Sequence, residues 1–171
     1  MTWFWYFTLY SFLGFLLEVA YARFTRGRPD RKCLLVLPLC PVYGLGALAI
    51  LLVARWFPSP FWIFALGGSA ATAVEYGTAF FYEEVLRVSF WDYRDLPGSL
   101  HGRVCPAFSL AWGLLALGLV YGVHPLLAPL PQAIPTPVSA LAAVTVGADL
   151  LLSSLLLRHT GDRTCLQWYR S

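Results

Sequence analysis

The hydrophobic positions of this chain fall into five long runs, separated by short polar or proline-rich segments. The runs cover residues 3–24, 33–57, 61–82, 104–123 and 138–157. About 20 apolar residues, rising about 1.5 Å each as a helix, span a hydrocarbon core of about 30 Å. The pattern therefore predicts an all-α integral membrane protein with five transmembrane helices, forming one polytopic domain over residues 1–171.

Two prolines interrupt the start of the second run. Pro38 and Pro41 lack the backbone N–H that a helix interior needs. We therefore expect this helix to begin near Pro41, after an irregular LLVLPLCP entry. Irregular backbone at membrane depth is tolerated only where protein or water satisfies its hydrogen-bonding groups. A loop is expected over residues 124–137, which contain five prolines and no Asp, Glu, Lys or Arg.

The segment between the third and fourth runs concentrates charge. Residues 83–96 predict an amphipathic helix on the membrane surface, with Trp91 and Tyr93 at headgroup level. Pro97-Gly98 ends this helix. The sequence leaves open whether residues 97–103 re-enter the membrane or only lie on it.

Composition and charge place the chain in the cytoplasmic membrane. It is 58% hydrophobic and 12% charged, whereas soluble domains carry about 25% charged residues. With five spans, eleven of the twelve Lys and Arg residues fall on one side and only Arg55 on the other. This bias predicts an N-terminus outside and a C-terminus inside. No basic face recurs, so we expect membrane lipids and no nucleic acid as partners.

A shift of 65 residues aligns two halves of the chain without a gap. Glu18 falls on Glu83, and Cys40-Pro41 falls on Cys105-Pro106. The halves, about 11–53 and 76–118, would form two parallel pseudo-repeated helical pairs, with the fifth helix left over. Transporters place their sites at such repeat interfaces. The alternative is chance similarity in a leucine-rich chain.

Three carboxylates lie within the predicted spans. Burying the charged form of Glu18, Glu75 or Asp149 at membrane depth costs free energy unless the carboxylate is ion-paired, protonated or hydrated. They are candidates for a proton or cation relay, or for a ligand anchor. The structural alternative is an ion pair with Arg103 or a hydrogen-bonded, protonated acid. Glu18 and Glu75 lie near helix ends, where the side chain can reach the interface.

Arg103 is the best counter-ion for Glu18, Glu75 or Glu83. Its planar guanidinium also suits a phosphate, so a phosphorylated substrate or a lipid headgroup is a second interpretation, and a helix-end anchor is a third. Trp91, Asp92 and Tyr93 are interpreted first as caps and anchors of the charged segment. The complete set of candidate substrate- or ion-binding residues is Glu18, Glu75, Glu83, Arg103, Tyr43, Tyr76, Ser109, Asp92, His101 and Asp149.

The four cysteines and three histidines show no metal-binding spacing, so no metal or cofactor is expected. The repeat could pair Cys40 with Cys105 as a disulfide. Both lie toward the predicted cytoplasmic half, however, where thiols stay reduced. We interpret them as small packing residues before helices that start at proline.

Four motifs resemble a known family. They are YSFLGFLLEVAY (10–21), LPLCPVYGLGA (37–47), VEYGTAFFYEEVLRVSFWDYRDLP (74–97) and HGRVCPAFSLAWG (101–113). On these motifs the chain is similar to the small bacterial integral membrane proteins of the ABC-transporter type IV, or CmpB-like permease, family. Phe90 stands where the family usually has Trp, and Ser99 near a usual Asn. The resemblance implies a membrane-embedded, transport-related protein.

The sequence is consistent with three functions. The leading hypothesis is a transporter or permease component, in which the carboxylates change protonation or pairing with Arg103 as substrate passes. The chain has no Walker A motif, so an ATPase would be a separate subunit; a homodimer is also plausible for so small a bundle. The second hypothesis is a membrane enzyme that acts on a lipid or polyprenyl phosphate near Asp92, His101 and Arg103. The third is a non-catalytic scaffold that binds a partner through the small residues of the third span.

Overall fold

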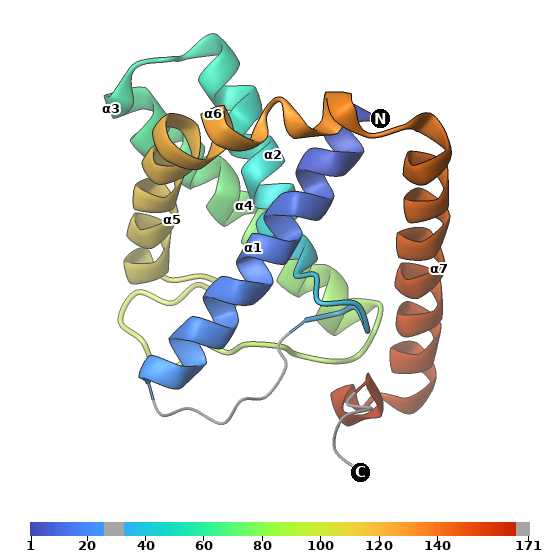
Figure 1. Cartoon of the computed structure of the whole chain (residues 1–171). Coiled ribbons are helices and arrows are strands. Elements are labelled where there is room, and N and C mark those ends of the chain that lie inside the picture. The colour runs from blue at the N-terminus through green and yellow to red at the C-terminus, as the bar shows by residue number, and fades with distance from the viewer. Residues whose placement is uncertain (26–32, 167–171) are drawn as a thin grey trace.

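The computed structural model describes residues 1–25 and 33–166, and over these residues its regular secondary structure is helical (Figure 1). The basic loop expected after the first helix falls largely on residues 26–32, outside the described residues, as do residues 167–171 of the tail. The helices are α1 (Thr2–Phe24), α2 (Pro41–Trp56), α3 (Pro60–Trp62), α4 (Gly68–Glu84), α5 (Pro106–Gly118), α6 (His124–Leu127) and α7 (Thr136–Thr160). The described residues also contain two π-helical turns, Ile63–Gly67 and Leu119–Val123, and two 3-10 turns, Leu130–Ala133 and Arg163–Leu166.

The π-helical turns join neighbouring helices, so that α3 runs into α4 and α5 runs into α6. Three segments are long and apolar enough to cross a membrane: Thr2–Phe24, Pro106–Ala133 and Thr136–Thr160. The helix α2 is a shorter apolar helix. The expectation of an all-α fold built on long apolar helices is therefore confirmed.

Helix α2 begins at Pro41, as the sequence predicted. Proline suits the first turn of a helix because the N–H that it lacks has no partner there. The chain before it, residues 33–40, forms no helix. Several backbone N–H groups of this segment find hydrogen-bond acceptors on other elements. The Cys40 N–H donates to the Ser11 carbonyl at 2.9 Å, and the Val36 and Leu37 N–H groups donate to Asp149.

The amphipathic helix predicted over residues 83–96 is wrong. Helix α4 continues to Glu84, and no helix follows until Pro106. On either side of Arg87, whose φ is +60°, the chain buries alternate residues, namely Leu86 before it and Val88 and Phe90 after it. These side chains pack with Tyr82 and with Leu157 of α7. The left-handed conformation of Arg87 takes the chain out of the helical path between Leu86 and Val88, and all three side chains reach the same apolar cluster.

The loop expected over residues 124–137 is also wrong. The chain stays helical through Leu127, and α7 already starts at Thr136. Pro125 is the second residue of α6 and follows a π-helical turn, which accommodates the change in backbone hydrogen bonding. The number of prolines alone therefore overestimated the length of the break between the two helices.

Small residues let the helices approach closely. The Tyr43 ring of α2 lies against Gly14 of α1. A Cβ atom on Gly68 of α4 would lie only 2.9 Å from the backbone nitrogen of Gly113 in α5. Close backbone approach of this kind is how apolar helices gain packing energy without a hydrophobic driving force between them.

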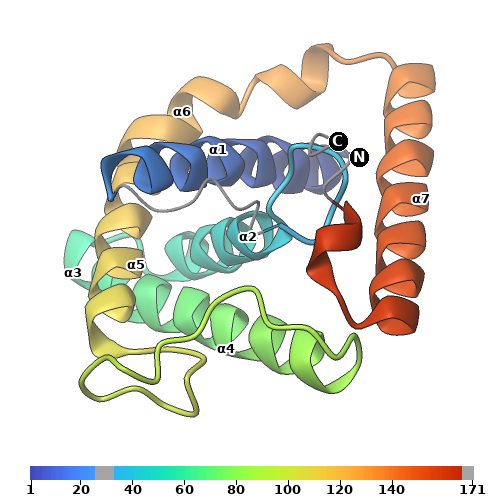
Figure 2. The same cartoon turned by 90° about the horizontal axis from the view of Figure 1, so that it is seen from below.

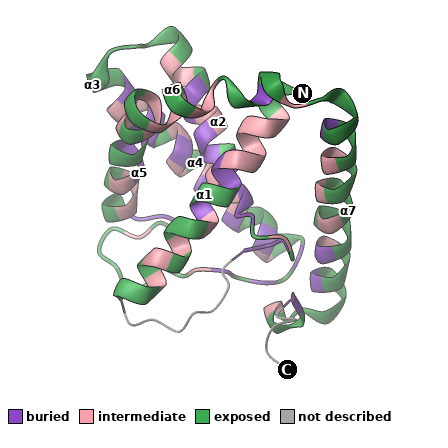
Figure 3. Cartoon of the chain, viewed as in Figure 1, coloured by how far each residue is buried: buried purple, intermediate pink, exposed green. Residues whose placement is uncertain are grey.

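Helix α7 stands apart from the other helices in both ribbon views (Figures 1 and 2). Near its start, the Ser139 hydroxyl accepts a hydrogen bond of 2.9 Å from Trp5 Nε1. Near its end, Leu157 is fully buried against Tyr82 and Leu86. Between these attachments most of its leucines are exposed, as the burial colours show (Figure 3). Such a helix presents its apolar surface to lipid or to another chain.

The contact between α4 and α5 leads to a prediction. Gly68→Ala should lower the melting temperature of the detergent-purified protein, because the new methyl group meets Gly113 backbone that cannot rotate away. Overpacking of this kind costs about 1–3 kcal/mol. Gly77→Ala in the same helix is the matched control, since nothing lies within 4 Å of the added atom; it should stabilise the protein by about 0.4–1 kcal/mol. Equal stabilisation by both substitutions would contradict the close α4–α5 approach.

Candidate functional site

Glu75 is a buried carboxylate in the middle of the bundle. It lies on α4 and is 5% exposed. The Tyr93 hydroxyl donates a hydrogen bond of 3.0 Å to Oε1, and Trp112 Nε1 donates one of 3.0 Å to Oε2. Tyr93 comes from the loop after α4, and Trp112 comes from α5. Each carboxylate oxygen therefore has a neutral donor, and the two donors tie the loop and α5 to α4.

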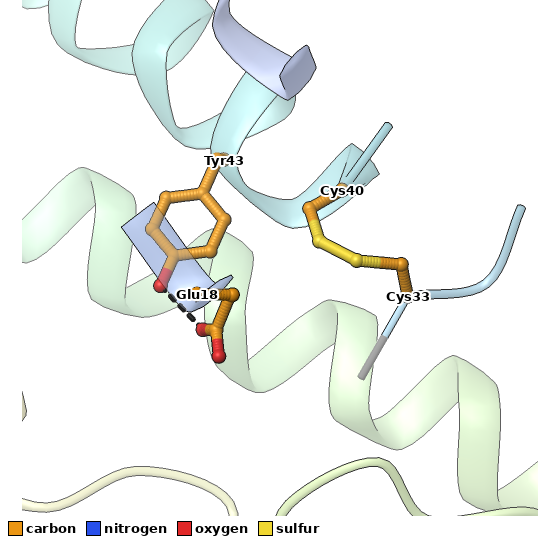
Figure 4. The surroundings of a disulfide bond; sticks show 4 residues. All are labelled: Glu18, Cys33, Cys40 and Tyr43. Atoms are coloured by element: carbon orange, nitrogen blue, oxygen red, sulfur yellow. Dashed lines mark hydrogen bonds between the residues drawn. A yellow bond between two sulfur atoms is a disulfide. The ribbon is translucent and has the colours of Figure 1, made fainter. Parts of the chain in front are cut away.

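Glu18 is the second carboxylate of this region. The Tyr43 hydroxyl of α2 points at Glu18 of α1 and donates a hydrogen bond of 2.6 Å to its Oε1 (Figure 4). The Tyr43 ring also packs against Trp112, with ring centroids 5.3 Å apart. Because Trp112 in turn donates to Glu75, the contact between Tyr43 and Trp112 links the two carboxylates. We call Glu18, Tyr43, Glu75, Tyr93 and Trp112 the central acidic cluster.

The central acidic cluster has no basic partner among the described residues. The ion pairs found over residues 1–25 and 33–166 join Arg94 to Asp92 and Arg103 to Glu83 and Glu84. Neither Glu18 nor Glu75 takes part in one. A pair of carboxylates that is held in apolar surroundings by neutral donors is a place where a proton or a cation relieves like-charge repulsion and the cost of burial.

A second polar group lies at the loop end of α4 and is centred on Arg103. Arg103 Nε donates a hydrogen bond of 2.7 Å to Glu83, and its Nη2 lies 3.5 Å from Glu84. Its Nη1 donates to the Tyr76 hydroxyl at 3.2 Å, and that hydroxyl lies 2.9 Å from His101 Nδ1. The hydrogen bond to Glu83 raises the pKa of Arg103. We call these residues (Tyr76, Glu83, Glu84, His101 and Arg103) the arginine cluster.

The loop between α4 and α5 positions both clusters. Gly98 and Gly102 adopt positive φ angles of 72° and 75°, which turn the chain back on itself. The Tyr93 N–H then donates to the Gly102 carbonyl at 2.8 Å, and Trp91 Nε1 donates to the Arg103 carbonyl at 2.9 Å. The same turn thus places Tyr93 at Glu75 and Arg103 at Glu83.

Asp92 lies outside both clusters. It is exposed and pairs with Arg94, whose side chain and backbone N–H both donate to it. These hydrogen bonds lower the pKa of Asp92 below its ordinary value. A Cβ atom on Gly102 would meet the Asp92 carboxylate, so Asp92 also packs against the turn.

Asp149 supports the backbone of residues 33–40. Its two oxygens accept hydrogen bonds from the Val36 N–H at 3.1 Å and the Leu37 N–H at 2.8 Å. The Ser153 hydroxyl donates to it at 2.9 Å. This carboxylate of α7 therefore holds the irregular entry to α2, and the structure does not bring it into either cluster.

Ser109 faces a groove between α4 and α5. Its hydroxyl donates to the Cys105 carbonyl within its own helix turn, at 3.2 Å. The groove has a volume of about 530 Å³ and is lined by Phe64, Ala65, Gly68, Ser69, Thr72, Pro106, Ser109 and Leu110. The groove is thus mainly apolar, and Ser109 makes no contact with either carboxylate of the central acidic cluster among the hydrogen bonds of the described residues.

The cysteines pair differently from the alternative that the repeat suggested. Cys40 forms a disulfide with Cys33, while Cys105 is a buried free thiol (Figure 4). Cys105 fits the interpretation as a small packing residue before a helix that starts at proline. For Cys40 the expectation of a reduced packing thiol is wrong, because this residue before α2 is disulfide-bonded. The disulfide closes residues 33–40 into a loop, which lies next to the helix turn that carries Tyr43.

The sequence named most of the charged groups but not their donors. Arg103 pairs with Glu83, one of the three partners expected, and not with Glu18 or Glu75. The sequence did not predict Trp112 as a hydrogen-bond donor, because an aromatic residue in an apolar run is expected to be a packing residue. Tyr93 was foreseen only as a headgroup anchor. His124 was expected in a loop, yet its Nδ1 lies 2.6 Å from the Tyr10 hydroxyl.

Among the residues that the structure describes, no group of three or more His, Cys, Asp or Glu side chains is placed to hold a metal ion. The carboxylate, phenol, imidazole and guanidinium groups of the two clusters can exchange protons, form hydrogen bonds and bind charged groups.

Long apolar helices around the buried Glu75 and the half-buried Glu18 define an α-helical membrane protein with a polar centre. Comparison with known families gives the family: the model described as "Putative ABC-transporter type IV" matches residues 5–154, and the chain belongs to this family. Neither the curated proteins nor the solved structures contain a match to the chain.

The arginine cluster leads to a prediction about stability. Arg103→Gln should lower the melting temperature by several degrees, because Glu83 loses its ion pair and the loop loses its tie to Tyr76. Arg94→Gln is the matched control in the same loop, and since its pair with Asp92 is largely exposed it should change the melting temperature by about 1 °C or less. Thermal unfolding of the two purified variants side by side checks this, and equal losses would show that Arg103 has no special structural role.

Proposed function

We propose that this protein is the membrane component of a transport system and that its central acidic cluster binds a proton or a small cation during the transport cycle. The observation that carries the proposal is the pair formed by Glu18 and Glu75, which are held by neutral donors and have no basic partner among the described residues.

The cluster gives a physical reason for coupling. Hydrogen bonds to an ionised carboxylate are about twice as strong as bonds between neutral groups. When Glu75 takes up a proton or a cation, its bonds from Tyr93 and Trp112 weaken. Those two donors belong to the loop and to α5, so the occupancy of Glu75 changes how firmly both are attached to α4. Ion binding would thus favour one arrangement of the bundle over another.

The proposed arrangement has five spans, with the N-terminus outside and the C-terminus inside the cytoplasmic membrane. It is supported by the position of the chain segments: the end of α1, the loop after α4 and the end of α7 lie at one end of the bundle (Figure 1). The described arginines other than Arg55 belong to these segments. At the opposite end, between α2 and α4, the exposed aromatic residues Trp56, Phe57, Phe61 and Trp62 are typical of an interfacial belt.

The internal repeat belongs to the same proposal. Helices α2 and α5 both start at a Cys-Pro pair, 65 residues apart. Glu18 and Glu83 are equivalent by this shift, but Tyr43 is replaced by Phe108, which has no hydroxyl to donate. Glu83 takes Arg103 as its partner instead. The two halves would thus have, at equivalent positions, one carboxylate held by a neutral donor and one carboxylate held in an ion pair.

Partners follow from the exposed apolar surface. Helix α7 leaves Leu141, Val144, Leu151, Leu152 and Leu155 exposed. Membrane lipids, a second copy of the chain or a partner subunit would cover them, and any ATPase would be a separate subunit.

The enzyme hypothesis fits the geometry less well. A lipid phosphate would need a free guanidinium, whereas Arg103 is already engaged by Glu83 and Glu84, and Arg94 by Asp92. The Nδ1 of His101 is already engaged in a hydrogen bond with the Tyr76 hydroxyl.

The test is ligand-induced stabilisation of the purified protein. Monovalent cations, protonated amines, phosphorylated metabolites and lipids would be screened by thermal unfolding. A cationic ligand at about one hundred times its Kd should raise the melting temperature of the wild type by about 5–10 °C. The rise should disappear in Glu18→Gln and Glu75→Gln and persist in Glu84→Gln, a matched control on α4 that is exposed and outside the central acidic cluster.

Two outcomes would contradict the proposal. Stabilisation that is equal in all three variants would place the ligand elsewhere. No cationic ligand at all, with Glu18→Gln and Glu75→Gln simply less stable than the wild type, would make the cluster a structural element and favour the scaffold hypothesis.

A further inference from the structure

The chain after α7 folds back onto the loop after α4. Gly161 ends α7 with a φ of +63°, and the 3-10 turn Arg163–Leu166 then runs back toward the bundle, as the view from below shows (Figure 2). A buried hydrophobic cluster joins the loop, α7 and this turn. We call its members Tyr82, Leu86, Val88, Phe90, Leu157 and Leu166 the lower cluster.

Three arginines lie beside the lower cluster, one on each element that it joins. Arg87 lies in the loop between two buried residues of the cluster, and Arg158 follows the buried Leu157 in the last turn of α7. Arg163 begins the 3-10 turn, and its Nη1 lies 3.5 Å from the carbonyl oxygen of Ser89, two residues along the chain from Arg87. We call Arg87, Arg158 and Arg163 the cationic rim.

The cationic rim carries positive charge that its neighbours do not neutralise. Arg87 and Arg158 are exposed and form no ion pair with any described residue, whereas the other two arginines of the loop are paired with acids. Asp162 precedes Arg163, and its carboxylate accepts hydrogen bonds from the hydroxyl and the backbone N–H of Thr164, which lower its pKa. Three guanidinium groups beside this one carboxylate leave a net positive charge.

The face of α7 that leads to Arg158 is apolar and exposed. Leu155 and Leu151 precede Arg158 by three and seven residues, so the three side chains lie on one face of the helix. Both leucines are exposed, as is Val144 about two turns further along this face. The first ten residues before Arg158 rise about 15 Å, which is half of a hydrocarbon core of about 30 Å. The apolar stripe beside the rim is thus long enough for the acyl chains of one leaflet.

An anionic phospholipid fits this surface better than a second copy of the chain does. A copy that packed α7 against α7 in the same membrane orientation would bring the two Arg158 side chains together at one depth, where like charges repel. A phosphate instead supplies the missing negative charge, and a guanidinium can bind it through two parallel hydrogen bonds. A zwitterionic headgroup would add a cation of its own, so the rim favours a lipid with net negative charge.

We propose that an anionic phospholipid binds here, with its phosphate on the cationic rim and its acyl chains along the exposed face of α7, and that it fastens the end of α7 to the loop after α4. This inference goes beyond the proposed function and does not rest on it, because the rim lies outside the central acidic cluster and the arginine cluster. The loop in question also carries Tyr93 and Arg103, so the lipid would stabilise the approach of this loop to α4.

The experiment is thermal unfolding of the delipidated full chain in detergent. Phosphatidylglycerol or phosphatidylcholine with the same acyl chains is added at the same mole fraction, and the readout is the difference between the two melting temperatures within each variant. A variant's own loss of stability therefore cancels. Phosphatidylglycerol should raise the melting temperature of the wild type by about 5–10 °C over phosphatidylcholine, as expected at about one hundred times the Kd. The triple variant Arg87→Gln/Arg158→Gln/Arg163→Gln should lose most of this rise.

Arg23→Gln is the matched control. Arg23 is an exposed arginine in the last turn of α1, and the end of α1 lies away from α7 in both ribbon views (Figures 1 and 2). This variant should keep the full rise, because its arginine lies at the same end of the bundle but not on the rim. Inorganic phosphate should give the wild type no rise, because it lacks the acyl chains that lie along α7.

Four results would overturn the proposal. The first is an equal melting temperature of the wild type in the two lipids, and the second is a full rise in the triple variant. The third is a loss in Arg23→Gln as large as in the triple variant, which would show general attraction between charges and no site. The fourth is stabilisation by inorganic phosphate equal to that by phosphatidylglycerol, which would show an anion site without a lipid.

Light scattering of the same samples tests the other occupant of this face. The proposal predicts that Leu151→Asn leaves the number of chains per particle unchanged and reduces the rise given by phosphatidylglycerol. A dimer that Leu151→Asn dissociates, with equal melting temperatures in the two lipids, would assign the face to a second copy and contradict the proposal.

Discussion

The structure depends on satisfying a carboxylate inside a bundle of apolar helices. Glu75 cannot be left without donors at this depth, and its two oxygens are satisfied by Tyr93 and Trp112. Meeting this requirement fixes the loop after α4, because Tyr93 must reach back to α4, and it fixes the position of α5 through Trp112. Tyr43, which packs on Trp112, extends the same arrangement to Glu18. Four helices (α1, α2, α4 and α5) and the loop after α4 are thus joined through neutral donors around two acids.

Much of the fold could be predicted from the sequence because apolar run length and proline position are local signals. The start of α2 at Pro41 and of α5 at Pro106 follows from what proline does in the first turn of a helix. The two errors arose where local signals compete with packing. Residues 83–96 carry charges that suit a surface helix, but burying Leu86, Val88 and Phe90 in one cluster selects an irregular chain with Arg87 in the left-handed region. The prolines after His124 suggested a loop, but π-helical and 3-10 turns accommodate them.

The candidate site was less predictable, because its chemistry is carried by contacts across the bundle. A carboxylate in an apolar run is conspicuous, so Glu18, Glu75 and Asp149 could be named. Their partners could not, since nothing local distinguishes Trp112 from a packing residue, or shows that Asp149 caps the backbone N–H groups of residues 36 and 37. Arg103 illustrates the same limit: three carboxylates were possible partners, and only the turn at Gly98 and Gly102 directs it to Glu83.

The central claim is that Glu18 and Glu75 exchange an ion while the arginine cluster stays paired. The most direct measurement is an infrared difference spectrum of the reconstituted protein between low and high pH, in which protonated carboxyl groups absorb separately from carboxylates. The account predicts a carboxyl band that titrates in the wild type, is diminished in Glu18→Gln and in Glu75→Gln, and is unchanged in Glu83→Gln. A titrating band that Glu18→Gln and Glu75→Gln leave intact, or one that Glu83→Gln removes, would contradict it.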